Sequence, residues 1–69
     1  MKRHTKGNNS FTAIVTVKKT GFKYAYAFNA FGQMEANNWL AWKFDLTSVD
    51  AIALAGRWGL YDGQPYLLP

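Results

Sequence analysis

Residues 11–30 place the strongest constraint on the fold of this chain, because their side chains alternate as those of a β-hairpin do. With Thr20 and Gly21 in the turn, the apolar and aromatic side chains of both strands fall on one face. The polar and small side chains fall on the other face, and a shift by one residue would mix the two sets. The predicted cross-strand pairs on the apolar face are Val17–Tyr24, Val15–Tyr26 and Ala13–Phe28.

The length and composition allow one small domain. A chain of 69 residues buries only about 60% of the surface that its unfolded state exposes, so each core residue must bury a large area. There is no cysteine to supply a disulfide, and 17% of the residues are aromatic, each of which buries a large area. No segment approaches the roughly 20 apolar residues of a membrane span, and the N-terminal residues lack the apolar run of a signal peptide. We therefore expect a soluble, cytoplasmic protein that makes no contact with a membrane.

The basic residues are unevenly distributed along the chain. The net charge is +4, but Lys2, Arg3 and Lys6 lie in residues 1–10, which show no apolar periodicity and are predicted to form a flexible leader. Residues 11–69, the predicted single domain, contain five basic and four acidic side chains, which leaves a net charge of only +1. The total charge is therefore a weak argument for nucleic-acid binding.

After the hairpin, the apolar periodicity changes to that of a helix over residues 33–44. Glu35 near its start and Lys43 near its end both suit the helix dipole. Two tryptophans fall on the polar side of this predicted helix. The predicted inward face comprises Met34, Ala36, Leu40, Ala41 and Phe44, and the predicted outward face comprises Glu35, Asn38, Trp39, Trp42 and Lys43.

Residues 49–56 admit two interpretations. Thr47 and Asp50 resemble the ends of a capping box, and the alternating alanines favour a helix that ends at Gly56. Against a helix, the segment is short, and turn signals and further strand-length apolar segments follow it. We prefer the strand, which predicts an α+β fold: an antiparallel sheet with one helix packed across one face (ββαββ). A helix would give a ββαα arrangement with a C-terminal extension.

No residue pattern indicates catalysis. His4 is the only histidine and lies in the predicted leader, and neither Ser10 nor Ser48 has a base in a recognisable motif. Asp45 and Asp50 are the closest carboxylates, and turn or capping roles explain both. There is no phosphate-binding glycine loop and no cluster of metal ligands. We predict that the protein is not an enzyme and holds no metal or cofactor.

The hairpin offers two candidate binding features. Lys18, Lys19 and Lys23 are predicted to gather at its tip, where either solvent or an acidic partner relieves their repulsion. The aromatic row of the hairpin either forms the core beneath the helix or stacks nucleic-acid bases on an exposed sheet. We prefer the core, because the cross-strand neighbours of the row are apolar. The row comprises Phe22, Tyr24, Tyr26 and Phe28.

The two tryptophans of the helix are the third candidate feature. Either residues 58–69 fold over them, or they contact a partner, since tryptophan is enriched at interface hot spots. We predict a partner-binding surface in which the indoles contact the partner and the lysines supply complementary charge. The candidate residues are Trp39, Trp42, Lys18, Lys19, Lys23, Glu35 and Lys43.

The layout of residues 11–63 resembles that of compact ββαββ anti-CRISPR proteins, which are phage and mobile-element inhibitors of type I effector complexes. The resemblance lies in residues 11–15, in the predicted helix over 34–44, and in residues 52–62. It implies a non-enzymatic binder that covers a nucleic-acid-handling surface of a host protein or ribonucleoprotein complex. It is a resemblance of layout, and it carries over no functional residues.

Two other functions are consistent with the sequence. A small basic nucleic-acid-binding protein would use the hairpin tip and the leader, and its affinity would fall steeply with salt. A small structural protein would form homo-oligomers through a sheet edge. The predicted oligomeric state is accordingly a monomer or a small homo-oligomer.

Overall fold

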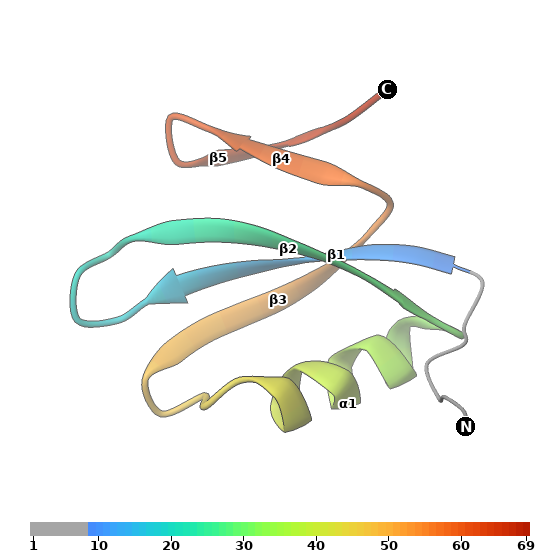
Figure 1. The fold of residues 1–69 in the computed structure, drawn as a ribbon, viewed down its shortest axis with the longest axis horizontal. Helices are drawn as coiled ribbons and strands as arrows, with labels where there is room; N and C mark the ends of the chain where they lie inside the picture. Colours follow the sequence, from blue (N-terminus) through green and yellow to red (C-terminus); the bar gives the residue numbers. More distant parts are fainter. Residues whose placement is uncertain (1–8) are drawn as a thin grey trace.

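A computed structural model describes residues 9–69 of the chain. It contains five strands and one helix, with short connections between them (Figure 1). The elements in chain order are β1 (Asn9–Val17), β2 (Lys23–Ala30), α1 (Gln33–Lys43), β3 (Val49–Ala55), β4 (Trp58–Tyr61) and β5 (Gln64–Leu67).

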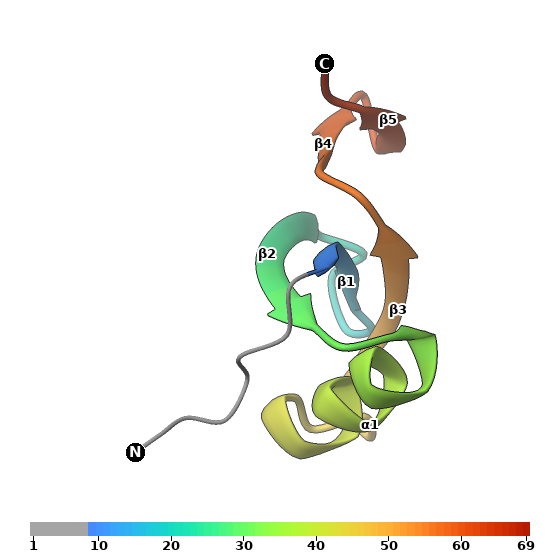
Figure 2. The ribbon, with the colours of Figure 1, turned by 90° about the vertical axis from the view of Figure 1, so that its right-hand side faces the viewer.

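The central layer is an antiparallel sheet with the strand order β2-β1-β3. Helix α1 lies against one face of this sheet, and the β4–β5 hairpin lies over the other face (Figures 1 and 2). This arrangement confirms the predicted α+β fold with one helix across one face of an antiparallel sheet. It also decides between the two interpretations of residues 49–56, which form β3 and not a second helix.

The helix-facing side of the sheet forms the core, as predicted, but only two of the four residues of the aromatic row, Tyr24 and Phe28, belong to it. Phe28 is buried and Tyr24 is half-buried, whereas 63% of Phe22 is exposed at the tip. The cluster of buried apolar residues draws on both hairpin strands and on the helix. It comprises Phe11, Ala13, Val15, Phe28, Ala30, Ala36 and Leu40.

The predicted hairpin register is wrong by two residues. The Val17 N–H donates to the Phe22 carbonyl over 2.8 Å and the Gly21 N–H donates to the Val17 carbonyl over 2.7 Å, so the loop occupies residues 18–21 and not the two-residue turn. Gly21 adopts a φ of 78° there, in the left-handed region that glycine tolerates. A two-residue shift leaves every side chain on its predicted face. The observed pairs are Val15–Tyr24, Ala13–Tyr26 and Phe11–Phe28.

Strand β3 owes its place in the sheet to its pairing with β1, which extends over the whole of β3. Ala51 and Ala53, whose helix propensity favoured the rejected interpretation, face α1 and are half-buried beneath it. Because their side chains are small, the helix can approach this strand closely. The alternating alanines therefore reflect packing of the helix against a sheet.

The β4–β5 hairpin is attached to the sheet by polar side chains. The Thr12 hydroxyl is buried (1% exposed); it donates to the Gly56 carbonyl over 2.9 Å and accepts the Trp58 N–H over 3.0 Å. The Arg57 guanidinium donates to the carbonyls of Phe11 and Phe28, at 3.3 Å each. These bonds hold residues 58–69 on the face opposite α1, so this segment does not fold over the helix tryptophans.

We expect Thr12→Val to lower the free energy of unfolding by about 2 kcal/mol, because the near-isosteric side chain leaves the Trp58 N–H and the Gly56 carbonyl without their partner. Urea unfolding followed by circular dichroism measures the change. Thr16→Val is the matched control: the Thr16 hydroxyl makes no hydrogen bond within residues 9–69, so a change within about 0.5 kcal/mol is expected. Equal stability of the two variants would contradict the role assigned to Thr12.

The predicted leader is only partly covered by the structure. Residues 1–8, which include His4 and the three N-terminal basic residues, lie outside the described residues. Asn9 and Ser10, assigned to the leader by sequence, are the first residues of β1. Within the described part of the chain, no helix has the length and apolar character needed to cross a membrane.

Candidate functional site

The structure separates the two helix tryptophans that the sequence placed together on the outward face. The Trp39 ring is half-buried and stacks on the Phe28 ring, with 4.1 Å between centroids and 7° between planes. Its ring also lies 5.8 Å from that of Tyr26 and 6.1 Å from that of Phe44. The predicted outward position of Trp39 is therefore wrong, and this side chain belongs to the contact between helix and sheet.

The reason lies in the rotation of the helix about its axis. At about 100° per residue, Trp39 lies about 60° from the buried Ala36, whereas Met34 lies about 160° away. Met34 is accordingly 79% exposed and Ala41 is exposed, although the sequence placed both on the inward face. The observed inward face consists of Ala36 and Leu40, and the partly buried Trp39 and Phe44 pack against the same core.

Trp42 has the exposure that the sequence predicted. Its side chain is 77% exposed, and it lies three residues beyond Trp39 on the flank of α1 that faces β2. The opposite flank faces β3, where the Gln33 side-chain amide donates to the Ala53 carbonyl over 3.1 Å. The exposed Trp42 indole therefore lies about one helical turn from the Trp39 indole, which stacks on Phe28.

The two charged candidates of the helix have local roles as well. The Lys43 ammonium lies 5.5 Å from the centroid of the Tyr26 ring, a cation–π geometry. The Glu35 carboxylate accepts the Phe31 N–H over 2.6 Å, just before the helix begins. Glu35 thus stabilises the N-terminus of α1, whereas Lys43 extends the aromatic cluster towards solvent.

Together these residues form what we call the indole flank: Trp39, Trp42 and Lys43 of α1 with Tyr26 of β2. Tyr26 was not among the predicted site residues, and 38% of it is exposed. Its contacts with Trp39 and Lys43 depend on the observed register and helix rotation. No signal in the sequence indicates them.

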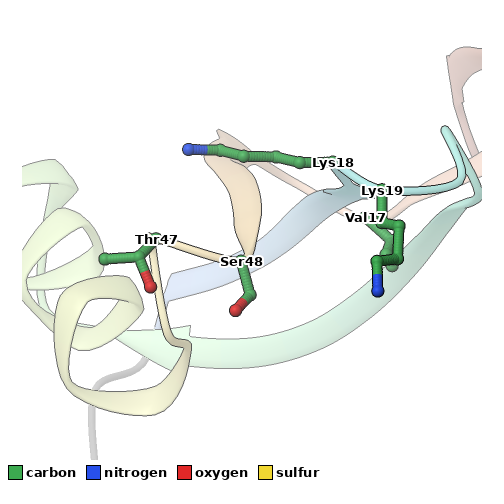
Figure 3. Close-up of a pocket in the computed structure, with 5 residues that line it drawn as sticks. All are labelled: Val17, Lys18, Lys19, Thr47 and Ser48. Carbon is green, nitrogen blue, oxygen red and sulfur yellow. The ribbon is translucent and has the colours of Figure 1, made fainter.

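The three tip lysines do not converge on one surface as predicted. The Lys18 ammonium lies 3.7 Å from the Asp50 carboxylate and donates to the Leu46 carbonyl over 3.1 Å, towards β3. Lys18 and Lys19 leave the loop in different directions around a shallow hollow of about 580 Å³ (Figure 3). Lys23 lies opposite Thr16 and does not line this hollow. The longer loop separates charges that a two-residue turn would have brought together.

The carboxylate of Asp45 has the turn role predicted for it. It accepts the Thr47 hydroxyl over 2.6 Å, the Thr47 N–H over 3.1 Å and the Ser48 hydroxyl over 3.1 Å. These bonds, of which the Thr47 hydroxyl contributes most, lower the pKa of Asp45 below its ordinary value, with a smaller contribution from the charge of Lys18. Asp45, Thr47 and Ser48 thus build the connection between α1 and β3.

The lowered pKa of Asp45 predicts a loss of stability in acid. A carboxyl whose pKa is lower in the folded state than in the unfolded state stabilises the fold above its ordinary pKa, and this contribution disappears as the pH falls below about 4. We expect the urea midpoint of the wild type to fall over this range. Thr47→Val, which removes the strongest bond to Asp45, should reduce the fall. An identical pH profile for Thr47→Val would contradict this assignment.

The C-terminal hairpin carries a second exposed apolar surface. Tyr61 is 78% exposed and Leu67 is 60% exposed, and a hollow of about 380 Å³ lies beside Tyr61, Pro65 and Tyr66. Its lining offers no charged group. Within residues 9–69, no three potential ligands among histidine, cysteine and carboxylate side chains lie close enough to hold a metal ion.

Comparison of the chain with protein-family models, with curated proteins and with solved structures found no match. The candidate site is therefore defined by its geometry alone.

Proposed function

We propose that this chain is a non-enzymatic protein-binding module whose contact surface is the indole flank. The observation that carries the proposal is the 77% exposure of Trp42 beside a stacked, half-buried Trp39. Large aromatic side chains held in place by neighbours lose little conformational freedom on binding, which is why tryptophan dominates interface hot spots. A rigid platform with one projecting indole suits a partner with an apolar pocket.

The charges of the flank define the partner further. Lys43 sits over Tyr26 at the edge of the aromatic cluster, so an acidic group beside the partner's pocket would complement it. The exposed surface of the β4–β5 hairpin has no such charge in its hollow. We therefore place the partner on α1 and not on the C-terminal hairpin.

The proposed partner is a host protein or ribonucleoprotein complex that handles nucleic acid, and the proposed action is inhibition in the host cytoplasm. The support for this class is the resemblance of the ββαββ layout to anti-CRISPR proteins of phages and mobile elements. On such a complex, the acidic group that pairs with Lys43 of this chain would lie next to the nucleic-acid-handling surface that the inhibitor covers. The inhibitor would then act stoichiometrically, by covering that surface.

The test is affinity capture from the host with the full-length chain, its Trp42→Ala variant and its Met34→Ala variant. Met34 is the matched control, because it is 79% exposed on another side of the same helix. We expect wild type and Met34→Ala to capture one complex and Trp42→Ala to lose it. The captured complex should then lose nucleic-acid binding when an equimolar amount of the chain is added. Undiminished capture by Trp42→Ala contradicts the proposal.

Nucleic-acid binding by the chain itself is the rival function, and Lys19 and Lys23 remain exposed for it. It predicts a shift of DNA or RNA at about 50 mM salt that disappears at higher salt, with log K falling by about 0.9 per phosphate contact for each tenfold rise in salt. The variant Lys19→Ala/Lys23→Ala would then weaken the shift, whereas Trp42→Ala would leave it unchanged. The proposed function predicts no such shift.

A further inference from the structure

The two edge strands of the sheet, β3 and β2, differ in how well their outward-facing backbone groups are protected from pairing with another strand. On β3, the Gln33 side chain donates to the Ala53 carbonyl over 3.1 Å and the Trp58 indole N–H donates to the Ala55 carbonyl over 2.8 Å. These side chains occupy acceptors that an added strand would need. On β2, the other edge strand, the only hydrogen-bonded neighbour within residues 9–69 is β1. The outer side of β2 is therefore the open edge.

The same bonds show which groups of β2 point outward. The carbonyls of Ala53 and Ala55 point away from β1, so these residues form non-hydrogen-bonded pairs with Ala13 and Phe11 of β1. The backbone groups of Ala13 and Phe11 therefore point away from β3 and towards β2. The bond from the Val17 N–H to the Phe22 carbonyl continues this alternation. The backbone N–H and C=O groups of residues 23, 25, 27 and 29 thus face away from the sheet.

Beyond Lys23, the first residue of β2, this edge lacks the devices that keep natural sheets from pairing. Residues 24–30 contain no charged residue and no proline, and the pairing of β2 with β1 runs without a bulge. Ala25 and Ala27 are exposed and small, so an approaching strand meets no bulky side chain on that face. Edge strands with these properties pair with other strands.

We propose that a second copy of this chain pairs antiparallel with β2, with Tyr26 opposite Tyr26 of the second copy. This register sets Ala25 opposite Ala27 and Lys23 opposite Asn29, so no two residues of like charge are cross-strand partners. It also sets Tyr24 opposite Phe28, an aromatic cross-strand pair. The strand is thus complementary to itself, and the two copies share one continuous six-stranded sheet. The inference needs no host partner, but Tyr26, at the centre of the pairing, also belongs to the indole flank.

The first test is the solution mass of the full-length chain by sedimentation equilibrium. We expect twice the 7.8 kDa of one chain. Ala27→Pro should give the monomer mass with an unchanged circular dichroism spectrum, because the Ala27 N–H points outward and proline is tolerated on edge strands. A monomeric wild type at about 1 mM, the weak end of specific association, overturns the proposal, as does a dimer that Ala27→Pro leaves intact.

A charge pair tests the register and does not depend on the folding of the proline variant. In Ala25→Lys/Ala27→Lys, two lysines face two lysines across the new pairing, and we expect a monomer. In Ala25→Lys/Ala27→Glu, each lysine faces a glutamate of the second copy, and we expect the dimer to return. Equal masses for the two variants overturn the proposed register.

Discussion

Replacing Trp39 with alanine lowers the free energy of unfolding by about 3 kcal/mol. The substitution removes the ring that stacks on Phe28 at 4.1 Å and that contacts Tyr26 and Phe44. Alanine also admits water to the contact between α1 and β2. Because Trp39 is half-buried, the expected loss lies at the lower end of the range for truncating a large aromatic side chain.

A loss of this size is decisive in a domain this small. A domain of fewer than about 70 residues rarely has more than about 3–5 kcal/mol of stability, so Trp39→Ala should retain no more than about 2 kcal/mol and unfold at a much lower urea concentration. Urea unfolding measured by far-ultraviolet circular dichroism avoids the change that the substitution makes to fluorescence. Trp39→Phe, which keeps a ring on Phe28, should retain most of the stability. A Trp39→Ala midpoint equal to that of the wild type would show that the stacking is not structural.

Replacing Trp42 with alanine should weaken partner binding but leave the stability nearly unchanged, unlike the replacement of Trp39. Its side chain is 77% exposed, so the free energy of unfolding should change by no more than about 0.5 kcal/mol. Affinity for the captured partner should fall by about 2 kcal/mol or more, which is about 30-fold. Isothermal titration calorimetry measures the affinity, and Met34→Ala provides the matched control. A Trp42→Ala variant that binds as tightly as Met34→Ala would remove Trp42 from the interface.

The faces of the hairpin could be predicted from the sequence, but its register could not. Alternation with a period of two assigns each side chain to a face, and this assignment survives a shift of two residues. The register depends on the loop, where Val17 bonds to both Phe22 and Gly21. Thr20 and Gly21 suit a two-residue turn and a longer loop alike, so local sequence does not choose between them.

Only part of the candidate site could be predicted from the sequence, for a similar reason. Periodicity identified the helix and the exposure of Trp42, but its rotation depends on how Trp39 fits against Phe28 across the sheet. That contact joins residues on different elements and follows from packing, not from residue type. Lys18 likewise pairs with Asp50 of β3, a neighbour that only the sheet order brings near.

The accessibility of the Trp42 indole in the free chain and in the complex tests most directly whether the indole flank binds the partner. In a Trp39→Phe/Trp58→Phe variant, Trp42 is the only fluorescent indole, and collisional quenching by acrylamide reports its exposure to water. We expect efficient quenching in the free chain and strong protection once the captured complex is bound. Equal quenching in the free and bound states would contradict the claim that this indole contacts the partner.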